Sequence, residues 1–314
     1  MTGVRFAALV ALVPALTLAQ PTPKQAEGAD AGDFVFSTET RLVQLPVTVM
    51  DSAGQVITTL PQSAFQVFEN GVPQEIKVFK REDVPVSLGL IIDNSGSMRE
   101  KRAAVEAAAL TLVRDSNKQD EVFVVSFNDD VNLDTDFTND IAAMERGLKK
   151  IDSRGGTAMR DAIRMSVGHL MDQGKRDKKA VLVVTDGNDN ASITALDALV
   201  RVAQQDEVIV YAIGLLTEEN PKEAAKAKQA LDKLVSSTGG EVFYPTELSE
   251  VERIAHKVAY DIRHQYTIGY TPSNPALDGT YREVKVSVTG PGHPVARTRS
   301  GYYAVEDRGK IKNP

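Results

Sequence analysis

The chain has 314 residues and is mildly acidic, with a formal net charge of −7 and no basic block, which argues against nucleic acid as its main partner. Its length suits one large domain or two ordinary ones, and its hydrophobic content of 42% is that of a globular protein. The chain contains no cysteine, which excludes disulfides, thiolate metal sites and cysteine nucleophiles, and its four histidines are scattered.

The N-terminus has the pattern of an export signal. Arg5 supplies a positive charge, residues 6–19 are apolar, and a small-residue cleavage site ends at Ala19. We therefore expect a signal peptide over 1–19, a polar linker over 20–33, and a mature protein that is exported, either periplasmic or secreted. No later apolar run in the sequence reaches the roughly 18 residues of a membrane span, so we expect no transmembrane segment.

Two segments show the two-residue alternation of half-buried strands. Residues 34–83 predict about four short antiparallel strands, and residues 266–305 predict about three more before a polar tail over 306–314. Because three strands alone are marginally stable, we expect both segments to meet in one seven-stranded antiparallel β-sandwich. Two separate β appendages are the open alternative.

Residues 84–265 alternate apolar strands with helices. The continuous apolar runs at 84–92, 121–127 and 180–185 are typical of strands that are covered on both faces. Segments with helical periodicity, 10 to 20 residues long, lie between the strands. This order predicts an α/β domain with a mostly parallel, doubly wound, Rossmann-like sheet, inserted in or flanked by the sandwich.

Oxygen-bearing side chains stand where the predicted strands end and where one helix begins. They are Asp93, Ser95, Ser97, Thr157 and Asp186. Ligands of open α/β sheets bind at the carboxyl ends of the strands, so we expect these five side chains to converge there. In an extended turn, residues two apart point the same way, which would explain the alternation in Asp-x-Ser-x-Ser. A set of oxygen ligands favours a hard cation, Mg²⁺ or otherwise Mn²⁺ or Ca²⁺, over zinc.

Three ordered pieces carry a resemblance to a known family. DNSGS (93–97), GGT (155–157) and TDG (185–187) resemble the metal-ion-dependent adhesion site, or MIDAS, of the von Willebrand factor type A (VWA) domain. The resemblance covers about 84–265, and all five positions of the motif are present. With its flanking β segments, the chain is similar to exported bacterial "VWFA-related domain" proteins.

The resemblance implies a role for each residue of the motif. Ser95 and Ser97 would coordinate the metal directly, and Thr157 would do so in a ligand-competent state. Asp93 and Asp186 would act mostly through water or by orienting the serines. A Glu or Asp carboxylate of a partner protein would complete the coordination. We also expect Asp93→Ala to abolish Mg²⁺ binding at little cost to the fold, as at an exposed strand end.

The function that we expect is therefore non-enzymatic adhesion or protein binding. Two alternatives are a Mg²⁺-dependent phosphatase of the haloacid dehalogenase type, and a structural scaffold in which the ion only fixes the loops. Ser95 argues against the phosphatase, because that chemistry needs an acid/base aspartate two residues after the nucleophile. We interpret GNDN (187–190) as a polar loop rather than a second ion site. Nothing in the loops indicates a particular ligand or an oligomeric state.

Overall fold

The computed structural model describes residues 42–81, 83–115, 117–148, 153–216 and 220–305. The expected signal peptide, linker and polar tail lie outside these ranges. The described residues all belong to one compact unit of the chain. Among them, no helix combines the length and the apolar character that crossing a bilayer requires.

A six-stranded sheet with strand order β10-β9-β8-β5-β6-β7 forms the centre of the α/β part. Its strands are β5 (Val86–Asp93), β6 (Glu121–Phe127), β7 (Val131–Thr138), β8 (Lys178–Thr185), β9 (Ile209–Gly214) and β10 (Val242–Phe243). Only the pairing of β6 with β7 is antiparallel. Every residue of β5, β6 and β9 is buried, as expected for strands with both faces covered.

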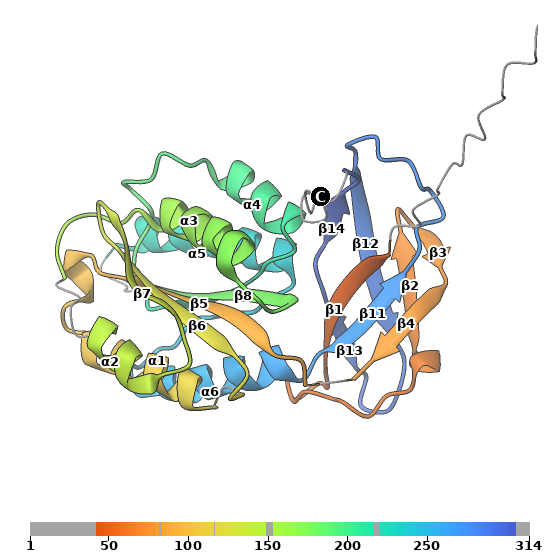
Figure 1. Ribbon diagram of the computed structural model, residues 1–314, viewed down its shortest axis with the longest axis horizontal. Coiled ribbons are helices and arrows are strands. Elements are labelled where there is room, and N and C mark those ends of the chain that lie inside the picture. The colour runs from red at the N-terminus through yellow and green to blue at the C-terminus, as the bar shows by residue number, and fades with distance from the viewer. Residues whose placement is uncertain (1–41, 82, 116, 149–152, 217–219, 306–314) are drawn as a thin grey trace, which may run out of the picture. The chain divides into compact units, whose positions relative to one another are not determined.

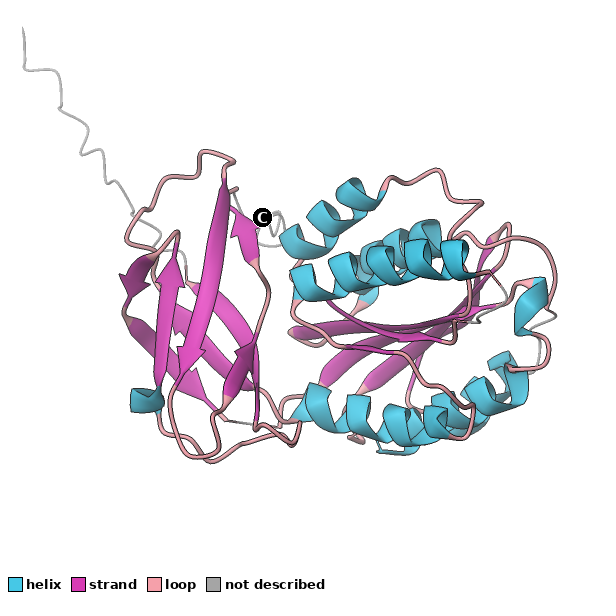
Figure 2. Ribbon diagram, turned by 180° about the vertical axis from the view of Figure 1, so that it is seen from behind, coloured by secondary structure: helices cyan, strands magenta, loops and turns pink. Residues whose placement is uncertain are grey.

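Helices cover both faces of this sheet, as Figures 1 and 2 show. They are α1 (Arg102–Asp115), α2 (Ile141–Leu148), α3 (Met159–Gln173), α4 (Leu196–Gln205), α5 (Pro221–Thr238) and α6 (Glu250–Arg263). Alternate residues of β5 enter different cores. Leu90 and Ile92 pack with α1 and α6, whereas Ile91 packs with α3, α4 and α5. The predicted doubly wound, mostly parallel sheet is confirmed.

Two antiparallel sheets form the sandwich, with strand orders β13-β1-β11-β4 and β14-β12-β2-β3. The strands and one short 3-10 helix are β1 (Val43–Met50), η1 (Gln62–Ala64), β2 (Phe65–Glu69), β3 (Val72–Gln74), β4 (Ile76–Lys80), β11 (Tyr266–Tyr270), β12 (Tyr281–Val288), β13 (Val295–Arg297) and β14 (Gly301–Tyr303). Both sheets contain strands from before and after the α/β part, which alternate in the first sheet and meet at the β12–β2 pair in the second. This confirms the shared sandwich and excludes two separate appendages.

Among the described residues, the sandwich has eight strands, whereas seven were expected. Residues 266–305 contain four strands rather than about three, because the stretch between β13 and β14 crosses from one sheet to the other. In this stretch, Thr298 Oγ1 donates to Pro46 O of β1, whereas Ser300 N donates to Ser237 O of α5. The chain therefore leaves the ladder of β1 before it pairs with β12.

Buried polar contacts join the sandwich to the α/β part. Arg297 of β13 makes ion pairs with Glu241, just before β10, and with Asp261 of α6. Gln265 Nε2 donates to Thr48 Oγ1 of β1 and to Tyr211 OH of β9. Asp261, Gln265, Thr48 and Tyr211 are buried, whereas Arg297 and Glu241 are partly buried, so the two parts share a largely desolvated polar boundary.

Candidate functional site

The carboxyl end of β5 is fixed by the side chain of Asp93. Ser95 N donates to Asp93 Oδ1 at 2.8 Å, and Thr185 Oγ1, at the end of β8, donates to Asp93 Oδ2 at 2.6 Å. Both carboxylate oxygens of Asp93 thus tie the loop after β5 to the end of the neighbouring strand. The sequence did not single out Thr185, although it directly precedes Asp186.

The hydroxyls of Ser95 and Ser97 lie 3.1 Å apart, and Ser97 Oγ donates to Asp186 Oδ1 at 2.8 Å. The expected reason for this convergence is wrong, because extended geometry ends at Ser95. Gly96–Met98 form a 3-10 turn instead, and this turn folds Ser97 back beside Ser95. Asp93, Ser95, Ser97 and Asp186 therefore form one cluster through a turn rather than through continued alternation.

Thr157 reaches the same edge of the sheet from the loop before α3. Its N–H donates to Asn190 Oδ1 at 2.9 Å, and its carbonyl accepts from the N–H groups of Asn190 and Ala191. A Cβ on Gly187, the residue after Asp186, would lie 3.8 Å from Thr157 Oγ1. The 187–190 loop thus holds Thr157 near Asp186, a role for Asn190 that sequence reasoning missed.

The site is mostly buried and opens to solvent at one residue. Asp93, Ser95, Thr157 and Asp186 are buried, whereas Ser97 is exposed. Burial, together with the smaller effect of nearby Asp186, raises the pKa of Asp93 to about 6, while hydrogen bonds from Ser95 and Thr185 oppose the rise. Such a site disfavours a concentration of negative charge and favours a nearby cation.

The expectation that Asp93 is an exposed strand end is wrong, since it is only 2% exposed. Replacing it by alanine would leave the buried donors Ser95 N and Thr185 Oγ1 without their acceptor, at about 1–3 kcal/mol for each such group. The serine hydroxyls are better positions for testing the site, because their removal leaves these two bonds in place.

A further residue of the site is Lys101, which the sequence analysis did not consider. Its ammonium group forms an ion pair with Asp186 Oδ2, and the two side chains are 15% and 1% exposed. Lys101 lies four residues after Ser97 and directly before α1, and this spacing is the signal that would have found it. Among the described residues, no group of three or more His, Cys, Asp or Glu side chains is arranged to hold a metal, so any cation here depends on the hydroxyls.

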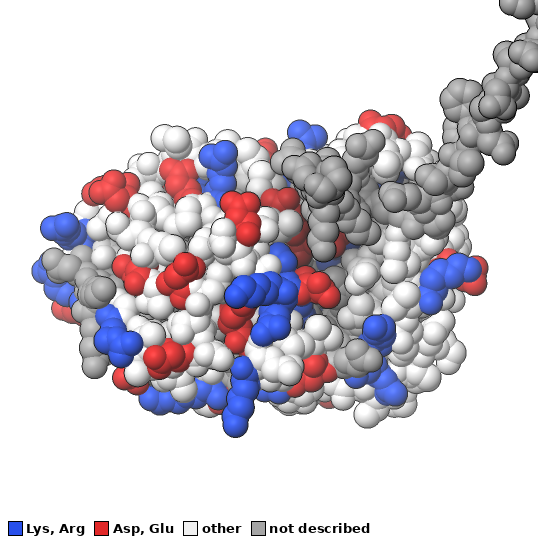
Figure 3. All heavy atoms as spheres, viewed as in Figure 1, with Lys and Arg blue, Asp and Glu red and all other residues white. Residues whose placement is uncertain are grey.

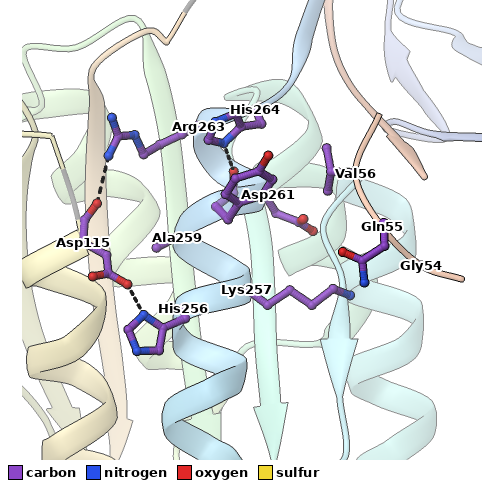
Figure 4. A pocket seen from close by; sticks show the side chains of 11 residues that line it. Gly54, Gln55, Val56, Asp115, His256, Lys257, Ala259, Asp261, Arg263 and His264 are labelled. Carbon is purple, nitrogen blue, oxygen red and sulfur yellow. Dashed lines mark hydrogen bonds and ion pairs between the residues drawn. The ribbon is translucent and has the colours of Figure 1, made fainter. Parts of the chain in front are cut away.

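A cavity away from the strand-end cluster is lined largely by ionic side chains. This cavity, of about 580 Å³, lies between α6, the end of α1 and the sandwich loop at 54–56. Figure 4 shows His256 directed at Asp115 and Arg263 at the Asp115 carbonyl. Lys257, also in this hollow, pairs with Glu241. These ionic groups are already paired with protein groups, and the strand-end cluster does not line the hollow.

Surface charge adds no competing feature on the face shown in Figure 3. There, Lys and Arg side chains lie interspersed with Asp and Glu side chains. An interspersed surface does not produce the concentrated positive field that nucleic-acid binding uses. The functional argument therefore rests on the strand-end cluster rather than on the charges of this face.

The fold and this cluster together define the class of the α/β part. It is a doubly wound α/β domain, with polar side chains gathered at the carboxyl ends of its parallel strands. Residues 88–188 match the family model described as "von Willebrand factor type A domain". The chain therefore contains a VWA domain.

The chain is similar to two curated bacterial proteins, both described as uncharacterized. The relative from Synechocystis sp. is 24% identical over 53% of this chain and 39% of its own length. The relative from Borreliella burgdorferi is 22% identical over 54% of this chain and 50% of its own length. The match thus spans half or less of the length of these relatives.

One similar solved structure is proximal thread matrix protein 1 from the mussel byssus, with a zinc-occupied MIDAS motif. It has a TM-score of 0.50 and 16% sequence identity, and the match covers 62% of this chain and 49% of that one. At this identity, the likeness concerns the fold.

Proposed function

We propose that this chain is an exported, non-enzymatic VWA module that binds a protein ligand through a divalent cation. The cation, Mg²⁺ or otherwise Mn²⁺ or Ca²⁺, would be held by a set of five side chains. They are Asp93, Ser95, Ser97, Thr157 and Asp186. When bound, such an ion would supply a Lewis-acidic position for a Glu or Asp carboxylate of the partner.

The observation that carries this proposal is the continuous contact from Asp93 through the serines to Asp186. Ser95 Oγ and Ser97 Oγ are 3.1 Å apart, and Ser97 Oγ lies 2.8 Å from Asp186 Oδ1. The donor set fits a hard cation, because it consists of hydroxyl and carboxylate oxygens from separate loops. The ammonium of Lys101 beside Asp186 is a further sign of fit, since a positive charge is already accommodated there.

The roles proposed for the chain's own residues follow from their contacts. Asp93 orients Ser95 through the backbone N–H, and Asp186 orients Ser97 through its hydroxyl. With neutral hydroxyls as direct ligands, little of the ion's charge would be offset before the partner's carboxylate arrives. Thr157 would act as a further hydroxyl ligand, held in place by Asn190.

A binding role is favoured over the phosphatase alternative. Both oxygens of Asp93 accept hydrogen bonds, from Ser95 N and Thr185 Oγ1, which gives this carboxylate a structural role in joining two strand ends. Ser95 offers a hydroxyl where an acid/base carboxyl would be needed. Turnover of p-nitrophenyl phosphate that depends on Mg²⁺ and on Asp93 would reverse this preference.

The comparisons support the proposal at a coarser level. VWA domains are commonly adhesion or protein-binding modules, and the mussel protein of similar fold has zinc in its MIDAS motif. Support for export comes from the signal pattern over residues 1–19. The module would then meet its partner outside the cytoplasm.

Calorimetric titration of the chain with Mg²⁺ tests the metal site. We expect one site in the wild type and no measurable binding in the Ser95→Ala/Ser97→Ala variant, because two proposed direct ligands are lost. The matched control is Ser236→Ala/Ser237→Ala, a serine pair of α5 whose hydroxyls donate to Lys233 O. Equal Mg²⁺ affinity in all three proteins would contradict the proposed site.

The adhesive role needs a second experiment. A pull-down from the envelope fraction of the parent cell, in Mg²⁺ and in EDTA, should recover a partner only with Mg²⁺ and only with intact serines. If EDTA lowers the melting temperature but leaves the recovered proteins unchanged, the ion has only a scaffold role and the binding proposal is wrong.

A further inference from the structure

The side chain of Lys101 reaches the strand-end cluster from a fixed backbone. Its N–H donates to Met98 O at 3.0 Å, and its carbonyl accepts from Val105 N at 3.2 Å. The ammonium forms an ion pair with Asp186 Oδ2, while Asp186 Oδ1 accepts a hydrogen bond from Ser97 Oγ. Lys101 thus provides the positive charge that a nearly inaccessible carboxylate requires.

Other cations near the cluster have different partners. Arg99 donates to Ser153 O, Arg102 pairs with Glu106, and Arg160 pairs with Asp189. Among the described residues, Lys101 is the cation in ion-pair contact with Asp186. The positive charge at Asp186 therefore depends on one side chain with a flexible four-carbon stem.

We propose that Lys101 is a tethered competitor cation: it neutralises Asp186 in the metal-free protein, and a divalent ion must displace it in order to bind. The inference rests on the proposed metal site and names the residue that sets its affinity. An ammonium has three donors and no lone pair, so it cannot act as a metal ligand while it is charged. It can only repel the ion or move away from it.

This arrangement has two consequences of opposite sign. Without metal, Lys101 stabilises the loops by pairing the buried carboxylate of Asp186. With metal, Lys101 weakens the affinity for the ion. The ammonium and a divalent ion about 6 Å apart repel each other enough, even in water, to weaken metal binding about tenfold. A purely structural lysine would support both states, and a lysine that contacts only the partner would affect neither.

The experiment compares the full chain with Lys101→Gln, which keeps the length and polarity of the stem. We expect Lys101→Gln to tighten the Kd for Mg²⁺ about tenfold in calorimetric titration. In EDTA, its melting temperature should fall by about 2–4 °C. Lys101→Arg retains the charge and should keep an affinity near that of the wild type. Arg99→Gln removes a charge from the same loop without touching Asp186, and it should change neither measurement.

The outcomes separate this inference from the proposed function. If the wild type binds Mg²⁺ and Lys101→Gln binds it equally or more weakly, the competitor role is wrong and the metal site stands. An unchanged melting temperature in EDTA would also overturn the inference, because Asp186 would then not need its ammonium partner. If only the Lys101→Gln variant binds Mg²⁺, the result supports the competitor role most strongly. Absence of Mg²⁺ binding in every variant overturns both proposals.

Discussion

Arg297 offers a direct test of how the sandwich and the VWA domain are joined. It donates through Nη2 to Asp261 Oδ2 at 2.8 Å and through Nη1 to Glu241 Oε2. The Arg297 side chain is 17% exposed and that of Asp261 is fully buried. Arg297→Met keeps most of the apolar stem and removes the charge, so it isolates the ionic contribution.

The expected loss follows from the carboxylate that is left behind. Removing one partner of a buried ion pair typically costs about 3–5 kcal/mol. Glu241 retains Lys257, with its Nζ at 2.8 Å, so Asp261 is the group that loses its partner. We therefore expect the free energy of unfolding to fall by about 3 kcal/mol, the lower end of that range.

Urea unfolding followed by far-UV circular dichroism measures this loss, since the chain has no tryptophan. Adding Asp261→Asn to Arg297→Met removes the orphaned charge and should recover at least about half of the loss. The control Lys226→Met breaks an exposed pair with Glu223 and should cost less than about 0.5 kcal/mol. A loss below about 1 kcal/mol for Arg297→Met would refute the reasoning, and so would a double variant with additive losses.

The effect of Arg297→Met should also depend on pH. Burial already raises the pKa of Asp261, while Arg297 opposes the rise, so removing Arg297 should raise this pKa further. A group with a raised folded-state pKa binds protons more readily in the folded state. The variant should therefore recover stability relative to the wild type as the pH falls through the raised pKa of Asp261. A loss that stays constant from pH 7.5 to pH 5 would argue against an orphaned carboxylate.

Two other predictions concern packing and a buried amine. Gly240→Ala should destabilise the fold by several kcal/mol, because the added Cβ would lie 1.9 Å from Val210 O. Gly168→Ala, on the open face of α3, should instead stabilise the fold by about 0.5–1 kcal/mol. Thermal unfolding of the two variants compares these effects. Burial lowers the pKa of Lys178 from 10.5 to about 8, so the folded state binds its proton less readily, and wild-type stability should rise as pH increases from 8 to 10.5. Lys178→Met should remove this rise, measured by urea unfolding between pH 8 and pH 10.5; a variant whose stability still rises over this range would contradict this.

The clustering of the predicted site residues followed from their positions in the sequence. Asp93 ends β5 and Asp186 directly follows β8, and the carboxyl ends of parallel neighbours share one edge, so their proximity could be predicted without coordinates. The path of the turn between Ser95 and Ser97 could not be predicted, because the same sequence spacing of polar residues is compatible with a 3-10 turn and with an extended turn.

The missed features share a physical cause. Lys101 reaches Asp186 only because α1 begins one turn after the serines, and Asn190 reaches Thr157 only through the course of a loop. β7 was not predicted because it is a half-exposed edge strand, VNLDTDFT, whose polar side chains resemble those of a loop. Alternating and continuous apolar patterns in a sequence reflect the burial of side chains. Partly exposed elements at the edge of the fold therefore have weak sequence patterns.

The topology separates the site from the junction with the sandwich. β5 begins shortly after β4 and its eighth and last residue is Asp93, which at about 3.3 Å per residue places the site roughly 23 Å from the start of the strand. α6 leads back to β11 near that start, so both connections to the sandwich lie away from the carboxyl edge (Figure 1). A change at Arg297 and a change at Lys101 share no partner, so their effects on stability should add. The sandwich can thus carry the VWA domain without restricting the edge at which a partner would bind.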